Sequence, residues 1–235
     1  MDAPQGLRRT RISPALGRDR LSPSLGHMIM SDLIDAVERR FAELAVGLQP
    51  WPAPRGPHES ARKDEYSRVS DPEKYRLLKA RVDAWVSVLG EMAEIEESSS
   101  DEGLLQANAP DGSASLRLRP SNGAVPIVVR EITMTDEAYG VELAVGDPAE
   151  FWAFVPDCGC DACDHGWFDL AEYLDEQILT ILRGGTILVT DGVTTVQRYG
   201  DGASMSGSWN TNTSGWLDLV EQPDGLTVVR GDAWI

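Results

Sequence analysis

The sequence predicts an α+β fold in which an antiparallel sheet meander packs against two to three amphipathic helices. Apolar residues recur at helical spacing in the first part of the chain, whereas alternation of period two dominates after residue 104. A third helical pattern interrupts the strand-like runs near residue 168. We expect residues 1–30 to form a disordered basic tail and residues 31–235 a single domain. Its helical part covers about 31–97, and its sheet and cysteine-loop part about 104–235.

The first segment differs from the rest in charge. Residues 1–30 contain five arginines against two aspartates and show no apolar periodicity, which is typical of a disordered tail. The first predicted helix follows at residues 31–47, with Ser31 as its N-cap. The polar, proline-containing stretch from Gln49 to Val69 is then predicted to be irregular.

The second predicted helix has the clearest start. Ser70-Asp-Pro-Glu73 has the pattern of a capping box with proline in the first turn. Apolar residues then recur at steps of three and four from Tyr75 to Met92, which indicates a helix facing the core. The acidic run from Glu91 to Asp101 is predicted to end this helix in a solvated loop.

Strand signals make up most of the remaining sequence. A third helix is predicted from about Phe168 to Arg183 and ends at Gly184-Gly185. Asp191-Gly192 is a strong signal for a hairpin turn. Alternation and turn residues predict strands at 114–119, 126–134, 138–145, 186–190, 193–199 and 226–229.

Composition excludes several classes of function. The formal net charge is −17, with 21 Lys and Arg against 38 Asp and Glu, so a broad nucleic-acid-binding surface is not expected. No apolar stretch reaches 18 residues, and we expect no membrane span. The chain has no Gly-x-Ser-x-Gly elbow, no Gly-x-x-x-x-Gly-Lys loop and no Gly-x-Gly-x-x-Gly motif after a strand. All three cysteines lie within six positions, which favours a reducing cytoplasm over a secreted disulfide scaffold.

Those cysteines lie in one loop, Pro156-Asp-Cys-Gly-Cys-Asp-Ala-Cys-Asp-His-Gly166. This run resembles the signature of an uncharacterised bacterial family of unknown function, in which it joins a strand meander to a helix. The resemblance extends over most of the chain after Met30. It implies no activity and supplies no functional residues beyond the motif.

The loop is a candidate metal site. Cys158, Cys160, Cys163 and His165 would supply three thiolates and one imidazole, the donor set that Zn²⁺ favours. Cys160-x-x-Cys163 has the spacing in which two sulfurs converge on one ion, and Gly159 permits a tight turn between the first two sulfurs. All four donors lie within eight residues, whereas structural zinc sites usually join two separated pairs of ligands.

Three other interpretations remain open. Cys160-x-x-Cys163 before a helix could be a redox pair, although the surrounding aspartates oppose thiolate formation. A calcium loop counted from Asp161 would place cysteine and histidine at ligand positions, where a hard cation disfavours them. The cysteines could also be small packing residues, with Asp164 and Asp169 as ordinary acids at a helix N-terminus.

Function is open at this level. Our leading hypothesis is a cytoplasmic, non-enzymatic accessory or interaction protein with a structural cysteine loop, with or without Zn²⁺. Its acidic surface would favour a basic protein partner. The alternative is a metal-dependent enzyme that uses zinc held by the same loop.

Overall fold

The computed structural model describes residues 30–56, 58–98, 115–134, 137–199, 202–207, 215–219 and 223–235. The predicted tail lies outside these ranges apart from Met30. Three α-helices occur in the described residues: α1 (Met30–Leu44), α2 (Arg76–Leu89) and α3 (Trp167–Leu182). Short 3₁₀ helices lie at Lys63–Glu65 (η1), Pro72–Tyr75 (η2), Asp161–Cys163 (η4) and Trp216–Asp218 (η5).

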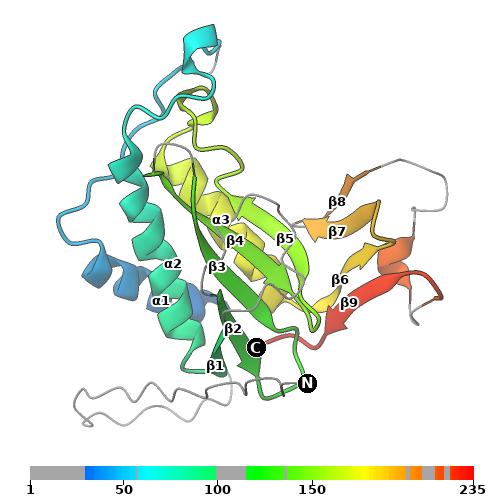
Figure 1. The fold of residues 1–235 in the computed structure, drawn as a ribbon. Coiled ribbons are helices and arrows are strands. Elements are labelled where there is room, and N and C mark those ends of the chain that lie inside the picture. Colours follow the sequence, from blue (N-terminus) through cyan, green and yellow to red (C-terminus); the bar gives the residue numbers. More distant parts are fainter. Residues whose placement is uncertain are drawn as a thin grey trace, which may run out of the picture.

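Two antiparallel sheets complete the architecture, so the predicted α+β class is confirmed (Figure 1). The larger sheet is a meander in the order β1-β2-β3-β4-β5, and the smaller has the order β8-β7-β6-β9. The larger sheet consists of β1 (Ala93–Ser98), β2 (Ser115–Pro120), β3 (Ile127–Thr133), β4 (Tyr139–Val145) and β5 (Glu150–Val155). The smaller consists of β6 (Gly185–Thr190), β7 (Thr195–Tyr199), β8 (Gly202–Ser206) and β9 (Thr227–Gly231).

One hydrophobic core lies between the helices and a single face of the larger sheet. Alternate residues of β4, Val141, Leu143 and Val145, belong to this core, as strand periodicity requires. From α2, Leu78 and Trp85 are almost fully buried in the same core. Residues of α1, α3, β6 and β9 also join it, so the smaller sheet is packed into the fold through β6 and β9.

The last residues of the chain also contact the segment that precedes β3. The Trp234 backbone N–H donates to the Leu182 carbonyl at 2.9 Å, and its indole N–H donates to the Val125 carbonyl at 2.8 Å. Trp234 is therefore buried between the end of α3 and the segment before β3. Among the described residues, no helix combines the length and the apolar character that crossing a lipid bilayer requires.

Three sequence predictions need correction. The acidic run after α2 is a strand rather than a loop at Ala93–Ser98, which forms β1 beside β2, whereas residues 99–101 of this run lie outside the described residues. Two of its three glutamates lie opposite arginines of β2, since Glu94 pairs in register with Arg119 and Glu96 with Arg117. Cross-strand opposite charges make an acidic edge strand tolerable. Strands β5 and β8 had no counterpart in the predictions.

The predicted helix caps also differ from those observed. Helix α1 begins at Met30, so Ser31 lies within it rather than at its cap. The second helical segment begins with η2, which directly precedes α2. The N-cap residue of η2 is Asp71, and no side chain forms a capping hydrogen bond there. The Ser70 hydroxyl instead contacts a distant loop, as described below. Helix α3 was predicted within one residue at each end, and Gly184 follows it with φ +69°.

Candidate metal centre

The cysteine loop, residues 156–166, connects β5 to α3 and brings its three thiols together. All three cysteines are free, and their sulfur atoms lie within 4.8 Å of one another. The turn η4 returns the chain on itself, because the Cys163 backbone N–H donates to the Cys160 carbonyl at 3.0 Å. The Cys158 thiol donates to the Cys160 sulfur at 3.1 Å. This group, called the thiol triad below, could hold one metal ion.

Two of the three thiols of the triad are exposed to solvent and one is buried. Cys160 is 5% exposed, whereas Cys158 and Cys163 are exposed. Burial opposes ionisation of Cys160, but hydrogen bonds from the Cys158 thiol and from the Ser67 backbone outweigh it and lower the pKa to about 7. Burial and the neighbouring Cys160 and Cys158 sulfurs raise the pKa of Cys163 to about 12. A bound cation would replace the protons of these thiols.

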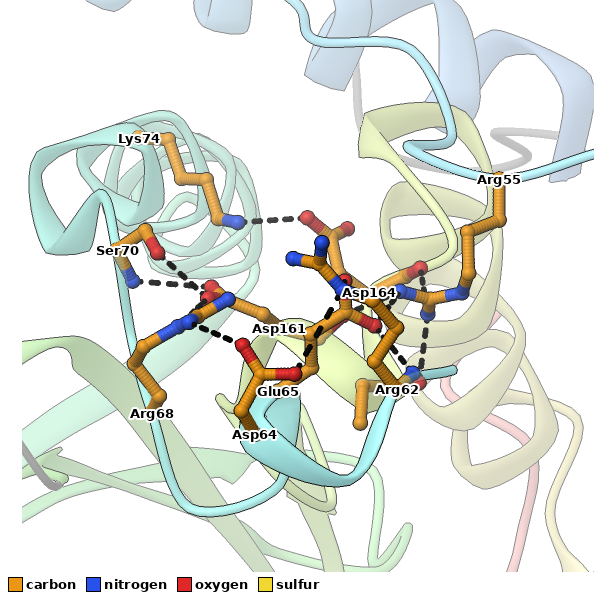
Figure 2. Close-up of polar contacts among 10 residues, drawn as sticks. Arg55, Arg62, Asp64, Glu65, Arg68, Ser70, Lys74, Asp161 and Asp164 are labelled. Carbon is orange, nitrogen blue, oxygen red and sulfur yellow. Dashed lines mark hydrogen bonds and ion pairs between the residues drawn. The ribbon is translucent and has the colours of Figure 1, made fainter. Parts of the chain in front are cut away.

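A segment far away in the sequence holds the loop in place. This bracing segment comprises residues 51–56 and 58–75, and Figure 2 shows its side chains converging on the loop. The Asp161 carboxylate accepts hydrogen bonds from the Ser70 N–H at 2.9 Å, from the Ser70 hydroxyl at 2.6 Å and from Arg68 Nε at 2.9 Å. Partial burial raises the pKa of Asp161, but Ser70 and the Arg68 guanidinium outweigh it and lower the pKa to about 2. Asp161 therefore anchors the turn between Cys160 and Cys163.

A second anchor lies at the start of α3. The Asp164 carboxylate accepts from Lys74 Nζ at 2.6 Å, from the Trp51 indole N–H at 3.0 Å and from the Gly166 N–H at 2.8 Å. Lys74 and Asp164 are both largely buried, with side chains 11% and 7% exposed. A charge-assisted hydrogen bond in such surroundings fixes the geometry of the turn that leads into the helix.

Arg55 binds the loop backbone directly. Its guanidinium donates to the carbonyls of Asp161 at 2.9 Å, Ala162 at 2.6 Å and Asp164 at 3.3 Å (Figure 2). Glu65 lies 3.3 Å from the same guanidinium. One planar guanidinium therefore provides hydrogen-bond donors to three backbone carbonyls of the turn.

Two further contacts close the bracing segment over the loop. The buried Tyr75 hydroxyl donates to the Gly159 carbonyl at 3.0 Å, and burial raises the pKa of this tyrosine, which keeps the hydroxyl protonated. Gly166 has φ +91° and ψ +170°, and a Cβ there would lie 2.5 Å from the Ala53 backbone nitrogen. Only glycine permits both this backbone conformation and this close approach.

A cleft of about 390 Å³ opens beside the thiol triad. Cys158, Cys163 and His165 line it, whereas Cys160 does not. The other lining residues are Tyr75, Pro156, Asp157, Asp164, Gly166, Asp169, Leu170 and Tyr173. An ion on the three sulfurs would therefore lie at the wall of this cleft.

The predicted ligands are thus brought together only in part. The three cysteines form a cluster, whereas His165 is exposed and lies outside the group of mutually close donor atoms. Its role as a fourth ligand stays a prediction. A strand, β5, precedes the loop, so the entering helix of an EF-hand is absent from this part of the described structure.

Sequence reasoning missed the bracing segment and misjudged the aspartates. Asp161 and Asp164 do not oppose thiolate formation as unpaired charges, because Arg68 and Lys74 neutralise them. One signal was present in the sequence: in a strongly acidic chain, the stretch before α2 is rich in cations. They are Arg55, Arg62, Lys63, Arg68 and Lys74.

Fold and site together define an α+β protein with a preformed cluster of three thiols at the passage from sheet to helix. The chain belongs to the family of unknown function DUF6226, whose model matches residues 37–229. No curated protein and no solved structure shows a significant match to this chain.

Proposed function

We propose that this chain is a zinc-binding accessory protein in which the cysteine loop holds one Zn²⁺. Cys158, Cys160 and Cys163 would supply thiolates, and His165 would supply an imidazole. One observation carries the proposal: three free sulfurs lie within 4.8 Å of one another in a loop that distant residues brace. Hydrogen bonds from surrounding residues to a ligand-bearing loop orient the ligands of metal sites.

The dimensions of the thiol triad support zinc. Tetrahedral Zn²⁺ with bonds to sulfur of about 2.3 Å places its sulfurs about 3.8 Å apart. The distance of 3.1 Å from Cys158 Sγ to Cys160 Sγ and the upper bound of 4.8 Å bracket this value. Thiolates select soft or borderline cations over Mg²⁺ and Ca²⁺.

His165 is the proposed fourth ligand because of its position. It follows Cys163 by two residues and lines the same cleft as Cys158 and Cys163. With four protein ligands, the coordination sphere of the ion would be complete and the site would be structural. The ion would then link the end of the meander to α3. With three, the fourth position would face the cleft.

Metal analysis of the reduced, purified protein tests the proposal. We expect about one equivalent of zinc, and we expect Cys163→Ser to remove it because two thiolates remain. His165→Ala should weaken zinc binding if the imidazole is a ligand, whereas His58→Ala, which changes an exposed histidine outside the loop, should not. A wild-type protein that folds fully and binds no zinc would overturn the proposal.

An accessory role implies a partner, and the net charge of −17 favours a basic protein. Complexes formed with a basic partner should dissociate as salt increases, because screening weakens exposed charge pairs. Partners isolated at low salt that prove to be predominantly acidic would contradict this part of the proposal.

The cleft favours a second candidate function, that of a metal-dependent enzyme. Two of the three thiols lie on the wall of a space of about 390 Å³. If His165→Ala retains one equivalent of zinc and full stability, the fourth position is open to the cleft, as catalytic zinc sites require. Loss of the metal in that variant would instead favour the structural site.

A further inference from the structure

The walls of the cleft combine sulfur donors with unpaired negative charge. Cys158 and Cys163 lie on one wall, and Asp157 and Asp169 contribute carboxylates. Among the described residues, neither of these carboxylates forms an ion pair. Asp157 accepts a long hydrogen bond of 3.5 Å from the Tyr173 hydroxyl. No lysine or arginine is among the described residues that line the cleft.

This electrostatic pattern discriminates between ligands by charge. The carboxylate of Asp164 forms an ion pair with Lys74, so the excess negative charge of the cleft comes from Asp157 and Asp169. Anionic ligands meet repulsion there, whereas an ammonium group meets two carboxylates. The partly buried Tyr173 ring also lines the cleft, whereas the buried Tyr75 ring already has Lys74 Nζ 5.2 Å from its centroid.

The metal would add a preference for the donor atom. Three thiolates on Zn²⁺ give the centre a net charge of −1, which weakens its attraction for hard oxygen donors. A soft thiolate is the fourth ligand that such a zinc ion holds best. Coordination of the incoming thiol to the zinc ion also lowers the pKa of that thiol, so the thiolate form can bind near neutral pH.

We propose that the cleft binds a small aminothiol, with its sulfur on the zinc and its ammonium group against Asp157 and Asp169. This inference rests on the proposed zinc centre. On binding, the thiol releases its proton to water, and its sulfur replaces the neutral donor, imidazole or water, at the fourth position. No atom changes oxidation state. A volume of about 390 Å³ accommodates a ligand larger than the aminothiol head group.

The test uses the full chain with Co²⁺ in place of zinc, because cobalt reports its ligands by visible absorption. Three probes separate the two recognition elements: cysteamine has both sulfur and ammonium, 3-mercaptopropionate has sulfur and a negative charge, and ethanolamine has ammonium without sulfur. We expect cysteamine to change the spectrum and to bind at least about tenfold more tightly than 3-mercaptopropionate. Ethanolamine should leave the cobalt spectrum unchanged.

A charge variant provides the matched control. Asp157→Asn combined with Asp169→Asn should remove the preference for cysteamine while retaining one equivalent of cobalt. Asp224→Asn, at an exposed site remote from the cleft in sequence, should retain the preference. Cobalt must stay with the protein after gel filtration. If cysteamine strips the cobalt from the protein instead, the inference is overturned.

Failure of this inference is distinct from failure of the zinc proposal. A protein that binds neither zinc nor cobalt removes the metal centre itself. A protein that binds cobalt but shows no spectral response to cysteamine, or binds 3-mercaptopropionate equally well, retains the metal centre and refutes the aminothiol site.

Discussion

Two turns of this molecule are held in opposite ways. The hairpin between β6 and β7 is fixed by its own residues, since Asp191 Oδ1 accepts from the Val193 N–H at 2.9 Å and from the Thr194 N–H at 2.7 Å. The cysteine loop is fixed by partners at a distance, and Arg55 contacts Ala162 across 107 positions. A local turn can be recognised from its sequence. A turn that other segments hold can be recognised only when its partners are known.

The largest difference between the two turns should appear at their glycines. Gly166 and Gly192 both have positive φ, +91° and +85°, but a Cβ on Gly166 would meet the Ala53 backbone at 2.5 Å, whereas one on Gly192 would meet nothing within 4 Å. Gly166→Ala should therefore lower the free energy of unfolding by about 3 kcal/mol or more, and Gly192→Ala by about 1 kcal/mol. Urea unfolding measures both, and equal losses would mean that the bracing segment does not lie against Gly166.

A smaller effect is expected at the aspartate that holds each turn, Asp161 in the cysteine loop and Asp191 in the hairpin. Asp161→Ala removes the acceptor for Ser70 and Arg68, and should lower the free energy of unfolding by about 2 kcal/mol. It should also weaken zinc binding by about ten- to a hundredfold, because the turn between two ligands loses its anchor. Asp191→Ala should leave zinc affinity unchanged. Competition with a zinc chelator measures both affinities, and indistinguishable values would show that the anchor has no influence on the metal site.

The smallest expected effect is a pH dependence of the local turn. Backbone N–H groups of Thr194 and Val193 lower the pKa of Asp191 below its ordinary value. The stabilisation is therefore complete above the unfolded pKa of about 3.9 and is lost as the pH falls through the lowered folded value. The stability difference between wild type and Asp191→Ala should shrink on acidification below about pH 4. If the stability difference between wild type and Asp191→Ala stays constant to lower pH, the charge of the Asp191 carboxylate does not stabilise the turn.

The elements that can be predicted from the sequence are those fixed by their own residues, and the elements that cannot are those fixed by distant partners. The hairpin at Asp191-Gly192, helix α3 and strands β3 and β4 were recognised because their periodicity or turn chemistry lies within the segment itself. The acidic segment of β1 predicts a loop when it is considered alone, because two of its three glutamates gain opposite charges only from the arginines of β2. The pattern around Ser70 predicts a helix cap, although the Ser70 hydroxyl contacts Asp161 at a separation of 91 positions.

The candidate site shows the same limit. The clustering of cysteines in the sequence predicted that their sulfurs would meet, and they do. The sequence could not reveal that Arg55 and Lys74 hold the loop, because nothing local pairs these cations with residues about 90 or more positions away. It also could not show that Cys158 and Cys163 face a cleft while Cys160 is buried.

The separation between Arg55 and the loop has a consequence for the order of assembly. The bracing segment is synthesised long before the cysteines, and α3 must emerge before the loop acquires its final turn into Gly166. Contacts between segments so far apart form late, because the chain between them must first be ordered. We therefore expect the three sulfurs to gather near the end of folding, so that a newly made chain acquires its metal only after the meander is in place.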